Sequence, residues 1–188
     1  MDTVFGVLAG LALAAACGFR VFVPLWVASL AVHAGYLEPT EGFAWLGTWP
    51  ALIMFTVATV AEITAYYVPW LDNFLDTLAS PAAVVAGSVV AASFAVDMDP
   101  FLRWTLAIVA GGGLAATVQT GTVAARGMSL SMSGGITNPG VSTAELGGAL
   151  VTSTLAVVMP WLAILGLVAV GLLAVTFVVR RRSGSRVG

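Results

Sequence analysis

An arginine interrupts the first long apolar stretch of this chain and restricts how that stretch can fold. The stretch runs from Val4 to Val32; Gly18 and Arg20 lie near its middle, and Pro24 follows. Placing an arginine at the centre of a bilayer costs about 2.5–3.5 kcal/mol on insertion scales. The charge is tolerated where a carboxylate, a backbone carbonyl or a water-filled cavity receives it. The sequence therefore predicts a buried polar site at this break and leaves its ligand open.

The composition indicates a membrane protein. The 188 residues are 60% hydrophobic and 9% charged, with a mean hydropathy of +1.03, whereas a soluble domain has about 25% charged residues. Several apolar segments approach the roughly 20 residues that cross a bilayer. We predict an all-α fold, a polytopic transmembrane helical bundle with broken or re-entrant helices, formed by one domain over residues 1–182 and followed by a disordered tail, 183–188. The predicted hydrophobic segments are about 3–32, 49–68, 81–96, 102–122, 144–158 and 160–180.

The arginines predict the topology, because basic residues favour the cytoplasmic side of a membrane. The chain has no lysine, and a cluster of arginines follows the last segment: Arg180, Arg181, Arg182 and Arg186. We therefore expect a multi-pass cell-membrane protein with a cytoplasmic C-terminus. The connections 33–48 and 97–100 are acidic and are assigned to the outside. Six crossings then place the N-terminus in the cytoplasm, whereas one kinked helix through Met159-Pro160 gives five crossings.

Matching positions in the two halves raise the hypothesis of an inverted three-plus-three repeat, 1–97 and 101–180. Such repeats are common in transporters. The alternative is chance, because Ala, Gly and Leu dominate the whole chain. The matches are Gly10-Leu11-Ala12 and Gly18 with Gly113-Leu114-Ala115 and Gly121, and Pro81 and Gly87 with Pro160 and Gly166.

Acidic residues of the first half are the next candidates for a site. Glu62 shares a helical face with Tyr66. It is either an interfacial carboxylate or a bundle-facing acid that pairs with an arginine or titrates during transport. Asp72 and Asp76 share one face of the segment that also contains Asn73. They are either solvated acids of an amphipathic surface helix or part of a cation site or gate.

The stretch 126–145 is the most polar part of the second half. Asn138 begins an Asn-Pro-Gly turn signal. Ser142 and Glu145 have the spacing of a capping box, which predicts that Ser142 begins the fifth helix. A partly re-entrant loop is the alternative. If the halves are inverted copies, Arg20 meets Glu145 and Arg126 meets Glu62 across the pseudo-twofold axis.

Several kinds of chemistry find no support in the sequence. His33 is the sole histidine and Cys17 the sole cysteine, so a histidine-based metal cluster and an intrachain disulfide are excluded. There is no catalytic triad and no P-loop, and Gly111-Gly112-Gly113 has no strand before it. We therefore expect no metal, no cofactor and no enzymatic activity. The glycines are expected to permit close helix packing.

Three motifs together resemble a bacterial membrane family that is catalogued as a domain of unknown function. The resemblance covers nearly the whole chain and implies a small polytopic inner-membrane protein, without an established activity. The family pattern has a second acid after the last glutamate and a lysine before the second arginine, where this chain has Leu146 and Gln119. The motifs are Gly18-Phe-Arg20-Val-Phe-Val-Pro24-Leu25, Pro69-x-x-Asp72-Asn73-x-x-Asp76 after Glu62, and Gly134-Gly-x-x-Asn138-Pro139-x-x-Ser142-x-x-Glu145.

The sequence favours a small transporter or channel for an ion or polar solute, with a polar site near the membrane midplane. A lipid-handling protein that binds a phosphate-bearing headgroup is the alternative, because the arginine fork suits phosphate. A noncatalytic membrane subunit is a third. Expected partners are membrane lipid and the solute, with no nucleic acid; a homo-oligomer is left open. The predicted site residues are Arg20, Glu62, Asp72, Asn73, Asp76, Arg126, Asn138, Ser142 and Glu145.

Overall fold

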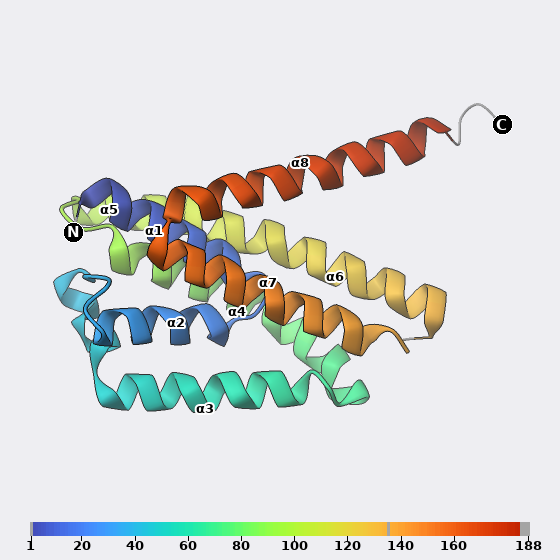
Figure 1. Ribbon diagram of the computed structural model, residues 1–188, viewed down its shortest axis with the longest axis horizontal. Helices are drawn as coiled ribbons and strands as arrows, with labels where there is room; N and C mark the ends of the chain where they lie inside the picture. Colours follow the sequence, from blue (N-terminus) through green and yellow to red (C-terminus); the bar gives the residue numbers. More distant parts are fainter. Residues whose placement is uncertain (1, 135, 185–188) are drawn as a thin grey trace.

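The protein is all-helical over the residues that the structure, a computed structural model, describes. These are residues 2–134 and 136–184, except for the side chains of 69–74, 76, 174–175 and 177–184. The helical bundle predicted from the sequence is confirmed (Figure 1). Its elements are α1 (Thr3–Cys17), α2 (Phe22–His33), the 3-10 helix η1 (Glu41–Gly47), α3 (Trp49–Ala65), α4 (Pro69–Phe94), α5 (Pro100–Leu106), the π-helix η2 (Ala107–Gly112), α6 (Gly113–Ser133), α7 (Asn138–Val158) and α8 (Pro160–Gly184).

The first apolar stretch folds into a helical hairpin. Helices α1 and α2 contain 15 and 12 residues, about 22 and 18 Å at the helical rise, each shorter than the roughly 30 Å hydrocarbon core of a bilayer. The Thr3 hydroxyl donates to Asp97 at 3.3 Å, and the Thr40 N–H donates to the Ser93 carbonyl at 2.8 Å. The start of α1 and the segment after α2 therefore lie at the same end of α4, as Figure 1 shows. The predicted break is confirmed, and the stretch enters and leaves the bundle at one end.

The longer helices supply the candidate membrane spans. By length and composition, three helices of the described residues can cross a bilayer: 77–94 within α4, the continuous run 100–133, and α7. The pair η1 and α3, bent by 66°, passes the same test when taken as one span. Helices α1 and α2 and the described part of α8 are shorter apolar helices.

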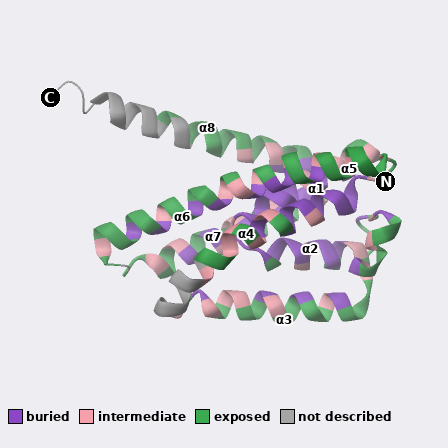
Figure 2. Cartoon of the chain, turned by 180° about the vertical axis from the view of Figure 1, so that it is seen from behind, coloured by how far each residue is buried: buried purple, intermediate pink, exposed green. Residues whose placement is uncertain are grey.

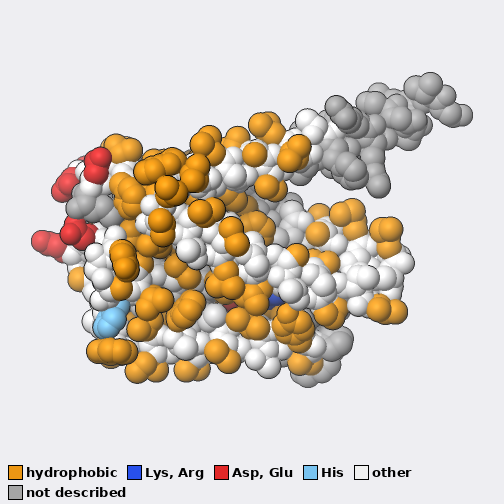
Figure 3. All heavy atoms as spheres, in the orientation of Figure 1, with side chains coloured by type: hydrophobic (Ala, Val, Ile, Leu, Met, Phe, Trp, Pro, Cys, Tyr) orange, Lys and Arg blue, Asp and Glu red, His pale blue; other side chains and the backbone are white. Residues whose placement is uncertain are grey.

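The hairpin corrects the predicted position of the N-terminus. Six crossings would have placed it opposite the acidic connection 97–100, but the hydrogen bond between Thr3 and Asp97 places it beside that connection. Acidic side chains gather at this end of the molecule (Figure 3). The single kinked helix through Met159 is also wrong, because α7 and α8 run in opposite directions on either side of this residue (Figure 1).

Small residues let α1, α4 and the π-helix η2 approach closely. A Cβ on Gly111 would lie 2.5 Å from the Ala91 Cβ and 2.9 Å from the Gly87 carbonyl oxygen. A Cβ on Gly112 would lie 2.7 Å from the Ser88 Oγ, whereas one on Gly113 would meet nothing within 4 Å. The predicted packing role is therefore confirmed for the first two glycines of this run. Burial is concentrated in α1, α2 and α4 (Figure 2), so the hairpin lies inside the bundle.

Candidate functional site

The break between α1 and α2 is capped by a glutamate of another helix. One Glu62 carboxylate oxygen accepts from the Val21 N–H at 2.8 Å, and the other accepts from the Phe22 N–H at 3.0 Å. These are free N–H groups at the start of α2, where the positive end of the helix favours an anion. Pro24 also lies in this first turn, where its missing N–H costs little. Glu62 therefore faces the bundle and fixes the tip of the hairpin from α3.

The tip also lies against α6. A Cβ on Gly18 would lie 2.5 Å from the Ala115 carbonyl oxygen and 2.8 Å from the Gln119 nitrogen. The Thr122 hydroxyl lies 3.5 Å from the Gly18 carbonyl oxygen and can donate to it. Since irregular backbone at membrane depth must be satisfied by protein or water, these contacts explain how the chain can break here.

Arg20 projects from the break into the interior. Its side chain is 2% exposed. The Nη2 group donates to the Ser142 carbonyl oxygen at 3.0 Å and lies 3.6 Å from Oε2 of Glu145. The guanidinium carbon lies 3.7 Å from the ring centroid of Tyr66. Within the described part of the chain, Nε and Nη1 of Arg20 are buried and have no hydrogen-bond acceptor.

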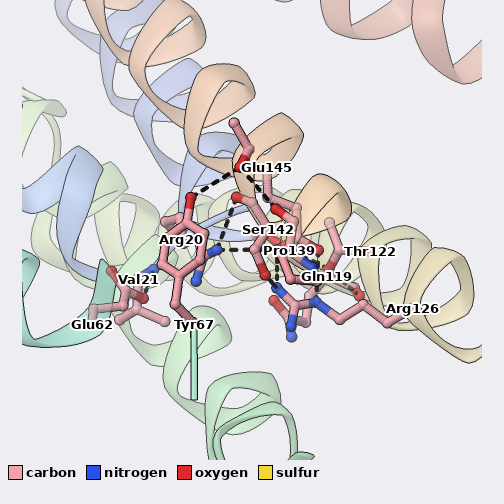
Figure 4. Close-up of polar contacts among 12 residues, drawn as sticks. Arg20, Val21, Glu62, Tyr67, Gln119, Thr122, Arg126, Pro139, Ser142 and Glu145 are labelled. Carbon is pink, nitrogen blue, oxygen red and sulfur yellow. Dashed lines mark hydrogen bonds and ion pairs between the residues drawn. The ribbon is translucent and has the colours of Figure 1, made fainter. Parts of the chain in front are cut away.

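Arg126 reaches the same carboxylate from α6. Its Nε donates to Oε1 of Glu145 at 2.9 Å, and its Nη2 contacts Oε2. Its Nη2 also donates to the Ser142 hydroxyl at 3.3 Å, and its guanidinium carbon lies 4.4 Å from the Tyr66 ring centroid. Two arginines therefore share one buried glutamate, one from the α1–α2 hairpin and one from the second hairpin, which α6 and α7 form (Figure 4). Such a desolvated ionic cluster depends on each member, because an unpaired buried charge is costly.

The polar stretch 126–145 is helical at both ends, which corrects one sequence interpretation. Helix α6 continues to Ser133 and α7 begins at Asn138. The re-entrant alternative stays a prediction, because it depends on how deep this stretch lies in a membrane. The N-cap of α7 is Thr137, and Ser142 lies inside the helix, so the predicted capping box is wrong. The physical reason is Pro139, which occupies the first turn of α7, where a proline starts a helix without losing a needed N–H.

Asn138 belongs to a group of hydroxyls at the end of the second hairpin. The Ser129 hydroxyl donates to Oδ1 of Asn138 at 2.7 Å and lies 2.6 Å from the Thr137 hydroxyl. The Ser133 hydroxyl lies 2.9 Å from that of Thr137. Ser129 follows Arg126 by about one helical turn. The facing sides of α6 and α7 thus carry polar groups from the turn between them to the shared glutamate.

The sequence of this chain is similar to that of one protein family. A family model described as a domain of unknown function, DUF4126, matches residues 7–181. The chain belongs to this family. The match contains most of α1, all of α2, α6 and α7, and every member of the arginine–glutamate cluster. Neither a curated protein nor a solved structure matches the chain. This DUF4126 chain is therefore a membrane protein of unknown function.

In this DUF4126 protein, the structure brings most of the predicted site residues together. Arg20, Arg126, Ser142 and Glu145 are in direct contact, and Glu62 supports the tip that carries Arg20. Asn138 lies in the neighbouring hydroxyl group. Asp72, Asn73 and Asp76 lie in α4, but their side chains are outside the described residues.

Of the two ion pairs expected from inverted halves, one is observed. Arg20 lies 3.6 Å from Glu145, as expected. Arg126 was expected to meet Glu62 and instead binds Glu145, while Glu62 binds the backbone of α2. Sequence analysis missed Tyr66 as a surface that both guanidinium groups stack against. Its position one turn after Glu62 was the available signal, because the two residues share a helical face.

Proposed function

We propose that this protein is a small membrane transporter or channel for an ion or small polar solute. The observation that carries the proposal is the buried cluster of Arg20, Glu145 and Arg126 at the tip of the α1–α2 hairpin. Charged side chains inside membrane-spanning bundles are rare, pair with one another or with backbone carbonyls, and mark substrate or ion pathways. Broken helices that end near the middle of the membrane form the sites of many secondary transporters.

The direction of the arginines supports solute movement over headgroup binding. Arg20 and Arg126 are 2% and 5% exposed, and both lie beside Glu145. A headgroup site would instead be expected to present its arginines to the lipid-facing surface. The lipid-handling alternative and the noncatalytic subunit therefore receive less support from this geometry.

A route for the solute is suggested by the inner face of α7. Asn138, Ser142, Glu145 and Ser153 lie along this helix, and the last three are buried. The Ser153 hydroxyl is buried without a hydrogen-bond partner among the described residues. A buried polar atom of this kind requires an explanation, of which an ordered water is the commonest. We propose that water and solute pass along this face, past the tip of the hairpin.

Glu62 is proposed to control the hairpin tip. Its carboxylate holds two backbone N–H groups of the break at 2.8 and 3.0 Å. Release of either hydrogen bond would loosen the backbone next to Arg20. The Glu62 carboxylate would therefore link a movement of α3 to the position of the Arg20 side chain. Glu62 is a positioning residue in this proposal, and Arg20 is a binding residue.

Flux measurements on purified protein in liposomes of phosphatidylethanolamine and phosphatidylglycerol test the proposal. A potential-sensitive dye reports ion movement under imposed gradients of sodium, potassium, protons, chloride or phosphate, and light scattering reports entry of neutral solutes. We expect wild type and Glu41→Gln, a control on the exposed η1 helix, to support a flux that empty liposomes lack. Arg20→Lys should reduce this flux strongly, because lysine keeps the charge but loses the fork. Folded wild-type protein that moves none of these solutes would refute transport.

A further inference from the structure

We propose that the ligand of this site is a small oxyanion, of the carboxylate or phosphate class, bound by the guanidinium group of Arg20. The inference deepens the proposed function by naming a substrate class, and its biological role rests on that function. Binding itself can be tested without any transport measurement.

The fold leaves a set of hydrogen-bond donors on Arg20 unused. The residue is 2% exposed, and its Nε and Nη1 atoms are buried without an acceptor in the part of the chain that the structure describes. A buried donor left unpaired costs about 1–3 kcal/mol, and more when it belongs to a charged group. The position of Arg20 is fixed by contacts of Glu62, Gly18 and Ser142. The unpaired donors therefore lie at a defined place in the fold, as a binding site requires.

The carboxylates around Arg20 are already engaged by other groups. The neighbouring Glu145 gives both carboxylate oxygens to Arg126. Its Oε2 lies 3.6 Å from Nη2 of Arg20, beyond hydrogen-bonding distance. The other nearby carboxylate, Glu62, has both oxygens on the backbone of α2. Arg20 therefore lies near two carboxylates, yet donates a hydrogen bond to neither among the described contacts.

The surroundings of the Arg20 guanidinium leave its N–H edge open to a planar ligand. The Tyr66 ring covers one face of the Arg20 guanidinium at 3.7 Å and leaves its N–H edge for a ligand in the plane. Carboxylate and phosphate oxygens match this planar arrangement of donors better than a spherical ion does. Unused groups on Arg20 are all donors, which disfavours a cation. The geometry selects an oxyanion.

In this proposal the anion reaches Arg20 past a contact between α7 and the turn that follows α3. The Tyr67 hydroxyl lies 2.9 Å from the Thr143 hydroxyl, and Tyr67 is exposed. Tyr67 follows Tyr66, whose ring covers Arg20, and Thr143 follows Ser142, whose carbonyl oxygen accepts from Arg20. Figure 3 shows a basic side chain between hydrophobic side chains midway along the bundle. Opening of this hydroxyl pair gives the anion a path to the guanidinium. The same path can admit a free anion or the phosphate of a lipid headgroup.

Binding is tested by calorimetry on detergent-purified full-length protein with inorganic phosphate, sulfate and acetate as probes. We expect saturable binding of at least one probe to wild type. Arg20→Gln and Arg20→Lys should abolish or strongly weaken it. Arg103→Gln, which removes an arginine that donates to the Met98 carbonyl in the α5 region, should leave it unchanged. Binding that survives both Arg20 substitutions in folded protein would overturn the inference, as would a folded wild type that binds no probe and no lipid phosphate.

A second measurement separates the sources of the oxyanion. Native mass spectrometry reports phospholipid adducts of wild type, Arg20→Gln and Arg103→Gln. Absence of probe binding together with a lipid adduct that needs Arg20 supports an oxyanion site whose ligand is a headgroup. If Arg20→Gln does not fold, wild-type protein with nitrogen-labelled arginine is titrated with phosphate and followed by NMR. A shifted Nε resonance of a slowly exchanging arginine supports the inference, and an unchanged spectrum contradicts it.

The outcomes also separate this inference from the proposed function. A cation flux without oxyanion binding would keep transport and overturn the oxyanion site. Oxyanion binding that depends on Arg20, in a protein that moves no solute across liposomes, would keep the site and overturn transport.

Discussion

The two hairpins α1–α2 and α6–α7 meet at one glutamate, but the arginine lies between two helices in the first and inside a continuous helix in the second. In the first hairpin the helix stops at Cys17 and restarts at Phe22, and Arg20 lies in the gap. In the second, α6 continues through Gly121 and Arg126 without a break. In both hairpins an arginine in an apolar segment marks a buried polar site. An arginine alone, however, does not cause the helix to break.

The additional requirement is a partner for the broken backbone. At the first hairpin, Glu62 accepts the free N–H groups of Val21 and Phe22, and Pro24 removes another donor. In α6 the N–H groups remain in the helical ladder, and the side chain of Arg126 alone reaches Glu145. A broken helix at membrane depth is therefore a property of two segments, the one that breaks and the one that caps it.

Removing the carboxylate that the hairpins share should have the largest effect. Glu145→Gln leaves Arg20 and Arg126 without their common counter-charge, and we expect it to destabilise the protein by about 3–5 kcal/mol. The temperature at which the monodisperse size-exclusion peak is lost in detergent measures this effect. Glu41→Gln, on the exposed surface of η1, is the matched control. Equal thermal stability of the two variants would show that the shared carboxylate does not hold the hairpins together.

The next largest effect should separate the two glycines that the sequence comparison pairs. Gly18→Ala places a Cβ 2.5 Å from the Ala115 carbonyl oxygen, and overpacking against backbone costs about 1–3 kcal/mol. Gly121→Ala meets nothing within 4 Å and should be neutral or stabilising by about 0.5–1 kcal/mol, because alanine favours a helix. The same thermal measurement distinguishes them. Similar behaviour of the two variants would mean that the break and α6 are not in close contact.

Weakening the cap should loosen the first hairpin and leave the second intact. Glu62→Gln keeps one acceptor oxygen and loses the other, at a cost of about 1–1.5 kcal/mol. Hydrogen–deuterium exchange by mass spectrometry should show faster exchange in a peptide covering 18–25. A peptide from α6 serves as the internal control. Unchanged protection of 18–25 would indicate that Glu62 does not cap α2.

The smallest effect is expected at the contact between α7 and the turn after α3, which is proposed to close the path to Arg20. Tyr67→Phe removes a hydroxyl that pairs with Thr143 at an exposed position. A hydrogen bond of this kind contributes about 0.5–1 kcal/mol. Tyr36→Phe, at a tyrosine that is 75% exposed, is the control. The apparent melting temperature should fall slightly for Tyr67→Phe and remain unchanged for Tyr36→Phe; the reverse order would contradict a closing role for the contact.

The sequence predicts which residues form the site better than how the chain reaches it. Arg20 and Glu145 were paired from charge alone, since a buried arginine needs an anion and few acids lie in apolar segments. The hairpin direction could not be predicted, because an apolar segment of about 30 residues is compatible with a tilted span or with two short helices. Capping of α2 by Glu62 is a contact between distant segments, and local patterns contain no information about it.

Helix boundaries in the polar stretch were misplaced for a local reason. Ser142 and Glu145 have the spacing of a capping box, but their side chains serve Arg126 and the helix begins earlier, at Asn138. The predicted repeat stays a prediction. Its matched glycines lie in different secondary structure, because Gly18 lies at the break and Gly121 lies inside α6.

The π-helix η2 makes the effect of a deletion depend on where it falls. A π segment accommodates one extra residue within an otherwise regular helix. Deleting one residue from Ala107–Gly112 should therefore restore α-helical geometry and leave Arg126 facing Glu145. Deleting one residue between 113 and 126, where α6 is a regular helix, would instead rotate the rest of α6 by about 100° and turn Arg126 away, although no member of the cluster had been replaced.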